Sequence, residues 1–172
     1  MLGRTETRVP QSDGADPIEL LKQDHQKVKQ LFDEFEQTNN RRSQQRIIRQ
    51  ALLELDVHAG IEEEIFYPAY QEAAQESEEE DIVLEAEEEH HVVHLLIGEL
   101  RDMPEVDERT AAKFTVLAEN VRHHIDEEEK EMLPAAKRLL GNNRLQELGV
   151  EMARRKRELT RELKQAAAST AM

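Results

Sequence analysis

The sequence predicts an all-α protein whose fold is an up-down-up-down four-helix bundle, followed by an additional C-terminal helix. Apolar residues recur at helical spacing along five stretches, and capping or helix-breaking residues separate those stretches. The first two stretches also match the next two at an offset of 65 or 66 positions, as two copies of one helical hairpin would. Two hairpins that pair antiparallel through short loops form such a bundle.

The first hairpin begins at Asp16, which suits an N-cap, with Pro17 at the first helical position. Its first helix carries an apolar stripe as far as Phe35. The second helix is expected over residues 43–75. Pro68 is expected to kink or shorten that helix near its end, because proline lacks the amide hydrogen that a helix interior needs.

The second hairpin is expected to contain a third helix over residues 81–103, which stops before Pro104. The fourth helix runs over residues 107–140, its first residue an aspartate that suits an N-cap, with Gly141 just beyond its end. A fifth helix covers residues 144–168 and carries apolar residues on one face.

Three segments follow from these assignments. Residues 1–15 are polar and mixed, which predicts a disordered N-terminal tail. Residues 16–141 form the bundle, and residues 142–172 form the C-terminal helix and tail. The fifth helix is expected to cover the bundle or to pair with a second copy, so we expect a monomer or a weak homodimer through the C-terminal helix.

The composition excludes several classes of protein. The 38 acidic residues exceed the 23 basic ones, and a net charge of -15 repels phosphate, so no nucleic-acid partner is expected. The absence of cysteine excludes disulfides, thiolate zinc sites and iron–sulfur clusters. The chain has neither a secretory signal nor an apolar run near the ~18 residues that span a bilayer. We therefore expect a cytoplasmic protein with no membrane partner.

One motif dominates the repeat. His58, three residues and Glu62 precede Pro68, and sixty-six positions later His124, three residues and Glu128 precede a proline in the same way. Residues four apart lie on the same face of a helix, so each copy aims an imidazole and a carboxylate at one point. Two facing copies would enclose a site rich in nitrogen and oxygen donors, which predicts a binuclear metal site.

The candidate ligands are the histidines and glutamates that lie in phase with the apolar stripes. They are His25, His58, Glu62, His90, His94, His124 and Glu128. Burying so many ionisable groups costs several kcal/mol each unless they are paired or bound to metal. His91 falls one position off its stripe, and so does His123, although His123 and Glu127 have the same spacing as the chosen pair.

These donors suit two metal ions. With a bridging oxide or hydroxide and two bridging carboxylates, five imidazoles fall one bond short of filling two six-coordinate ions. One position therefore stays open for chemistry. Mixed imidazole and carboxylate donors favour iron, with zinc, manganese and nickel as rivals.

Two other metal-site types do not fit. A ferritin-like di-iron site needs two Glu-x-x-His motifs on different helices. Glu87 with His90 has that spacing, but Leu55 stands in the corresponding place before His58 and Val121 before His124. A zinc protease would carry His-Glu-x-x-His, which is absent.

These motifs together resemble the hemerythrin-like family, also described as hemerythrin HHE cation-binding domains, over about residues 17–140. The resemblance rests on Asp24-His25, His58-x3-Glu62 with Phe66-Tyr67-Pro68, Glu89-His90-x3-His94, and His124-x3-Glu128 with Leu133-Pro134. It implies a centre of two Fe ions with a bridging oxo or hydroxo group. One iron would take His90, His94 and His124. The other would take His25 and His58 and keep the open position, with Glu62 and Glu128 bridging.

The additional helix and the N-terminal tail resemble the bacterial members, as does the last motif, where the invertebrate oxygen carriers place an aspartate one residue further on. The resemblance thus implies a di-iron protein that binds dioxygen or hydrogen peroxide, with catalase-like breakdown of peroxide and a role in oxidative stress. Sensing of iron, oxygen or nitric oxide, or iron handling without turnover, is the alternative. A helical scaffold with an opportunistic metal is a third hypothesis. Tyr67 and Tyr70 are read as ordinary packing residues in preference to supports of the metal site.

Overall fold

The computed structural model describes residues 16–75, 79–103 and 105–170, and the regular structure among them is entirely helical. The elements in chain order are α1 (Pro17–Glu36), α2 (Arg41–Ile61), η1 (Glu62–Phe66), α3 (Tyr67–Ala74), α4 (Glu80–Arg101), α5 (Glu108–Glu127), η2 (Glu128–Met132) and α6 (Leu133–Thr170). The predicted disordered tail lies outside the described residues. Among these residues, no helix is both long and apolar enough to cross a membrane.

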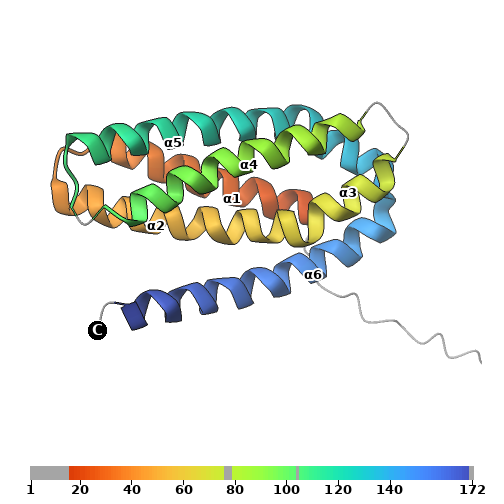
Figure 1. Cartoon of the computed structure of the whole chain (residues 1–172). Helices are drawn as coiled ribbons and strands as arrows, with labels where there is room; N and C mark the ends of the chain where they lie inside the picture. The colour runs from red at the N-terminus through yellow and green to blue at the C-terminus, as the bar shows by residue number, and fades with distance from the viewer. Residues whose placement is uncertain (1–15, 76–78, 104, 171–172) are drawn as a thin grey trace, which may run out of the picture.

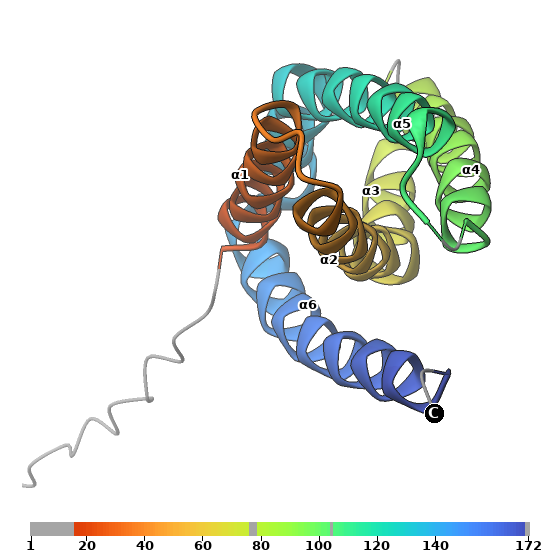
Figure 2. The ribbon, with the colours of Figure 1, turned by 90° about the vertical axis from the view of Figure 1, so that its left-hand side faces the viewer.

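The four-helix bundle is confirmed (Figure 1). Its first helix is α1, and its second is α2 continued through η1 into α3. Its third is α4, and its fourth is α5 continued through η2 into the first turns of α6. Gly141 interrupts α6 with a positive φ of 69°, which glycine adopts at no steric cost. The additional C-terminal helix is therefore the part of α6 after this break, and it packs beside α1 and α2 on the side away from α4 and α5 (Figure 2).

The helix starts follow local hydrogen bonding. The Asp16 and Asp107 carboxylates accept backbone N–H bonds at the starts of α1 and α5, as predicted. The Asn40 side chain does the same for α2, so that helix begins at Arg41, two residues before the predicted start.

Pro68 does not shorten its helix as expected, because α3 continues past it to Ala74, close to the predicted end at residue 75. A π-helical segment, η1, ends two residues before Pro68. The backbone N–H of Tyr67 bonds to the carbonyl of Glu62, five residues earlier. The same wide turn recurs in η2, which starts at Glu128. Such π-helical segments occur often at functional sites, and both of these begin at the glutamate of the repeated motif.

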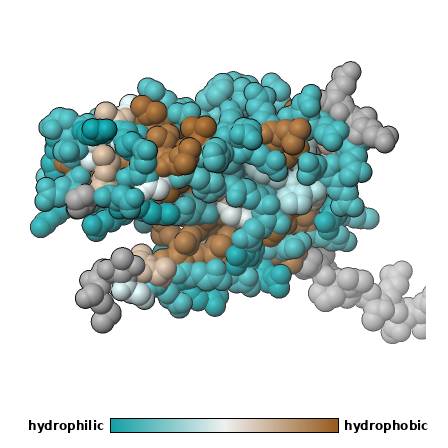
Figure 3. Space-filling view, in the orientation of Figure 1, coloured by the Kyte–Doolittle hydropathy of each residue, from teal (hydrophilic) through white to brown (hydrophobic). Residues whose placement is uncertain are grey.

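The apolar core is divided into two clusters by a layer of buried polar side chains. On α1, Leu21 belongs to one cluster and Val28 to the other, while His25 lies between them. One cluster is centred on the phenylalanines of α1 and α5, and the other on the aromatic residues of η1 and α3. The outer surface is mostly hydrophilic, and hydrophobic residues lie along the junction of α6 with the bundle (Figure 3). The polar layer is the candidate site.

Candidate metal centre

Six of the seven candidate ligands meet in the polar layer between the two clusters. They are His25, His58, Glu62, His90, His124 and Glu128, and all are buried. Each comes from a different element, in the order α1, α2, η1, α4, α5 and η2. The internal repeat thus brings two copies of one donor set together at the same level of the bundle.

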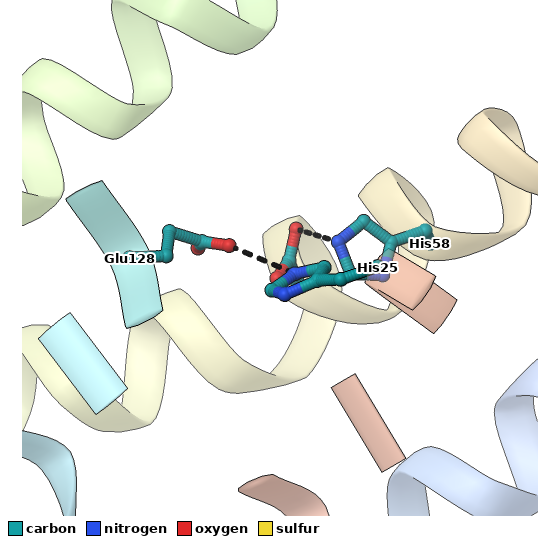
Figure 4. Close-up of side chains that lie close together, drawn as sticks. His25, His58 and Glu128 are labelled. Carbon is teal, nitrogen blue, oxygen red and sulfur yellow. Dashed lines mark ion pairs between the residues drawn. The ribbon is translucent and has the colours of Figure 1, made fainter. Parts of the chain in front are cut away.

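The first group of donors combines His25 and His58 with both glutamates. The Nε2 atom of His25 lies 3.3 Å from Oε2 of Glu128, and Nε2 of His58 lies 3.2 Å from Oε2 of Glu62. Figure 4 shows the two rings and the Glu128 carboxylate turned toward one another. One ligand atom from each of the four residues lies within 4.8 Å of the others, close enough for a shared cation.

The second group combines His90 and His124 with the same two glutamates. Nε2 of His90 lies 3.4 Å from Oε2 of Glu62, and Nε2 of His124 lies 3.5 Å from Oε2 of Glu128. The two Nε2 atoms are 3.1 Å apart. Each glutamate therefore reaches imidazoles of both groups, which is the arrangement that bridging carboxylates need.

Tyr67 adds a donor to the second group alone. Its hydroxyl oxygen lies 3.0 Å from His90 Nε2 and donates a hydrogen bond of 3.0 Å to Oε1 of Glu128. The side chain is only 1% exposed. Helical periodicity does not detect this residue, because five residues after Glu62 is off the ligand face of an α-helix. The π turn of η1 returns it to that face.

His94 lies outside this cluster, contrary to its expected place beside His90. Its side chain is 43% exposed, and its Nε2 atom lies 2.7 Å from Oε1 of Glu63. The phenol of Tyr67 stands next to His90 Nε2 in its place. Among the described residues, the one donor group that includes His94 also contains Glu63 and His90, and of its three members only His90 is buried.

Four further carboxylates stand behind the four imidazoles. The Nδ1 atoms of His25, His90 and His124 lie 2.8, 2.8 and 2.7 Å from carboxylates, and that of His58 lies 3.7 Å from one. The partners are Glu129, Glu63, Glu89 and Asp24, respectively. A carboxylate that accepts the Nδ1 proton fixes the tautomer and points Nε2 inward.

The four carboxylates, like the ligands, occupy corresponding positions in the two halves of the repeat. Asp24 and Glu89 each precede the histidine of the first or third bundle helix, and Glu63 and Glu129 each follow a bridging glutamate. Sequence inspection uses Asp24 and Glu89 only as markers of the repeat and misses the other two. Their position next to a ligand, in both copies, is the signal that could have found them.

The pKa values of the polar layer show that its buried carboxylates favour positive charge, or bound protons, on the groups around them. Burial opposes ionisation of Glu128, yet the charges of His124 and His25 hold its pKa below the usual range. Burial lowers the pKa of His90, but Glu62 and Glu63 outweigh it and raise that pKa to about 10. Burial and the charges of Glu128 and Glu62 raise the pKa of Tyr67 well above its usual value.

Buried atoms without hydrogen-bond partners test whether the cluster fits a metal. Among the described residues, six buried side-chain atoms have none, and four of them point to the cluster: His25 Nε2, His58 Nε2, Glu62 Oε1 and Glu128 Oε2. An unsatisfied buried polar group costs about 1–3 kcal/mol. Four at one place are consistent with a site whose partner is a cation.

Comparison with known proteins agrees with this site. Residues 16–136 match the model of the hemerythrin HHE cation binding domain. The crystal structure of the Rv2633c homolog from Mycobacterium kansasii, a hemerythrin HHE cation binding domain-containing protein, is similar at 27% sequence identity and a TM-score of 0.73. The match covers 86% of this chain and 89% of that one. No protein with a curated description matches.

Proposed function

Since the chain belongs to the hemerythrin HHE cation-binding domain family, we propose that its buried cluster holds two iron ions and binds dioxygen or peroxide. The observation that carries the proposal is a pair of donor groups that share Glu62, with Glu128 of the first group also 3.5 Å from His124 of the second. Imidazole and carboxylate donors in this mixture suit iron. Two irons joined by an oxide or hydroxide would supply the electrons and the Lewis acidity for oxygen or peroxide chemistry.

The two ions would have different ligands. His90, His124 and Tyr67 would hold one, His25 and His58 would hold the other, and both glutamates would span the pair. The repeat partner of Tyr67 is Leu133, which has no donor atom. The ion held by His25 and His58 therefore has one protein donor fewer, and this supports an open position there.

The surrounding residues orient the donors and limit the space around them. Glu129 lies 2.8 Å from Nδ1 of His25 and can accept its proton, while Asp24 faces Nδ1 of His58 at 3.7 Å. The hydroxyl proton of Tyr67 is held toward Glu128 Oε1 in the absence of metal, and metal binding would displace it. The two apolar clusters close the polar layer from above and below, which favours peroxide or dioxygen over larger ligands.

Metal analysis of the purified protein, with visible spectra before and after peroxide, tests the proposal. About two irons per chain and an absorption band from the bridged pair are expected, as for a site of this donor set. Rapid gas evolution would favour catalase-like turnover, whereas a stable coloured product would favour binding. Zinc or no metal, persisting after anaerobic reconstitution with ferrous iron, would contradict it.

A contact from α6 favours a second candidate, sensing of oxygen, nitric oxide or iron without turnover. The Lys156 ammonium bonds to Asp24, whose other oxygen faces His58. A change in the ion held by His58 would thus alter the contact between Asp24 and the C-terminal helix. In the wild type, protease should then cleave α6 at different rates in the oxidised and the reduced protein. Lys156→Met, which removes the contact, should change that difference in rate. If oxidation state never affects that cleavage in the wild type, the sensing candidate is wrong.

A further inference from the structure

The two halves of the repeat differ in how their outer faces are closed. In the first half, the positions around the donors carry Val57, Ile61 and Ile65, all buried. The repeat partners of these three residues are His123, Glu127 and Glu131. Asp24 is likewise buried under Lys156, while its partner Glu89 is partly exposed. One face is therefore apolar and covered by α6, and the other is acidic and uncovered.

The uncovered face contains a cavity that reaches the cluster of candidate metal ligands. It has a volume of about 120 Å³ and lies between α4 and the α5–η2 segment. Its outer walls include the carboxylates Glu85, Glu89, Glu127 and Glu131, and its inner walls include His124 and Glu128. Four acidic side chains around one opening attract cations and repel anions. The cavity thus connects solvent with two residues of the cluster.

A third donor group stands at the opening. Nε2 of His123 lies 3.2 Å from Oε1 of Glu127 and 3.8 Å from Oε1 of Glu89. One atom from each of these residues lies within 4.8 Å of the others. Donors bound to one ion at about 2.1 Å are themselves about 3 Å apart, so small side-chain movements would complete such a site.

Glu89 joins this outer group to the cluster. Its Oε2 atom accepts the Nδ1 proton of His124, while its Oε1 atom faces His123. Deeper in the cavity wall, Glu128 is only 2% exposed, and its Oε2 atom has no hydrogen-bond partner among the described residues. Donors of increasing burial thus line one path from the surface inward.

We propose that Glu89, His123 and Glu127 form an accessory site for a divalent cation, through which ferrous iron enters the buried cluster. Two carboxylates and one imidazole suit ferrous iron, manganese or zinc. The exposed site would hold the hydrated ion weakly, as release toward Glu128 requires. This inference rests on the proposed function only for the identity of the cargo.

The accessory site is tested with Mn²⁺, whose free form is counted by electron paramagnetic resonance. Wild type protein, as purified with its central metal, is expected to bind one additional Mn²⁺. The double variant H123A/E127Q should bind it more weakly by at least about tenfold, since even outer partners of a metal ligand contribute that much. Both substituted residues lie beside Glu89, and the variant leaves Glu89 itself in place as the partner of His124.

The matched control is E87Q/H91A on α4. It removes one carboxylate and one imidazole at the same spacing, and both of its residues are exposed. Retention of the additional Mn²⁺ in the control, with its loss in H123A/E127Q, supports the site. Equal binding in all three proteins, equal loss in both variants, or no additional Mn²⁺ in the wild type would overturn it.

The path inward needs a kinetic test on metal-depleted protein that circular dichroism shows to be folded. Anaerobic uptake of Fe²⁺ should be at least about tenfold slower in H123A/E127Q than in the control, with the same final iron content. Equal rates would overturn the path. A wild type that never takes up central iron would instead refute the proposed function, and the Mn²⁺ difference would still decide the accessory site.

Discussion

The first hairpin (residues 17–75) and the second (residues 80–140) place the same donors at the same level but surround them differently. Each supplies two inward histidines, one bridging glutamate and two supporting carboxylates. The first supplies the phenol of Tyr67, whereas the second lines an acidic cavity that opens to solvent. The comparison teaches that the repeated residues build the frame of the proposed two-ion site, while the residues that break the repeat would distinguish one ion from the other.

Removing either bridging carboxylate should have the largest effect. Glu62→Ala and Glu128→Ala should each lower the metal content from two ions to at most one and reduce the melting temperature. A metal that binds only the folded state at a thousandfold excess over its Kd contributes about 4 kcal/mol. Metal analysis and thermal melts measure both effects, with the exposed Glu87→Ala as control. If either variant still binds two ions normally, the substituted glutamate is not shared by two ions, and the two halves of the site are not equivalent.

The stability of the metal-free protein should fall as pH rises. In both halves an imidazole is held charged: Glu62 and Glu63 raise the pKa of His90 to about 10 against its burial, and Glu128 and Glu129 raise that of His25. A raised folded-state pKa gives stability that is complete below the unfolded value of about 6.5 and lost on the way to the folded value. We expect a loss on the order of a few kcal/mol between about pH 6 and pH 10.

Urea unfolding of the metal-free protein at several pH values measures this loss. The metal-loaded protein should respond in the opposite sense, because an imidazole must lose its proton to bind metal. Metal affinity should therefore rise over the same pH interval. A metal-free protein whose stability is constant with pH would show that the imidazoles are not held charged by the glutamates.

Tyr67→Phe sharpens the comparison between the two ions. The change removes one donor from the group of His90 and His124 and leaves the ring in place. One ion should then be lost more readily to a chelator by about 10–100-fold, the effect typical of altering a metal's surroundings. Ferric–phenolate absorption should disappear with it. Tyr70→Phe is the control, because that buried hydroxyl lies 3.4 Å from the backbone carbonyl of Glu79, away from the cluster. An unchanged spectrum would exclude Tyr67 as a ligand.

The smallest expected effect is a difference in stability between alanine substitutions at two helical glycines. A Cβ atom on Gly60 of α2 would lie 2.8 Å from the Cδ1 atom of Leu159 on α6, while one on Gly98 of α4 would meet no described atom within 4 Å. Gly98→Ala should stabilise the protein by about 0.5–1 kcal/mol. Gly60→Ala should gain less or destabilise it, because Leu159 must move. Urea unfolding separates the two, and equal gains would show that α6 packs loosely on α2.

Most of the fold was predictable from the sequence because helical periodicity and capping residues are local signals. Asp16 and Asp107 start their helices as predicted, and Gly141 interrupts the chain where the fourth helix was expected to end. The effect of Pro68 was predicted wrongly, because the rule that proline shortens a helix assumes regular α-helix on both sides of it. A wide turn that precedes a proline leaves no local composition signal.

The candidate site was predictable to the extent that it follows α-helical spacing. Six donors lie where the repeat and the apolar stripes predict them, whereas Tyr67 and His94 exchange places with respect to the cluster. The exchange depends on one π turn, whose effect on phase is invisible to a count of 3.6 residues per turn. Glu63 escaped notice because a glutamate on an acidic stretch resembles a solvated surface residue.

A π turn is an α-helix that carries one surplus residue. Deleting one residue from η1, such as Ile65, would restore regular helix and should make that segment locally more stable. Tyr67 would then follow Glu62 by four residues of regular α-helix, which is again the ligand face, so its phenol should stay at the cluster. Straightening η1 with all of its residues in place would instead turn every later side chain by about 100° relative to Glu62 and take the phenol away. The wide turn therefore accommodates one additional residue while it keeps the tyrosine in phase with the glutamate.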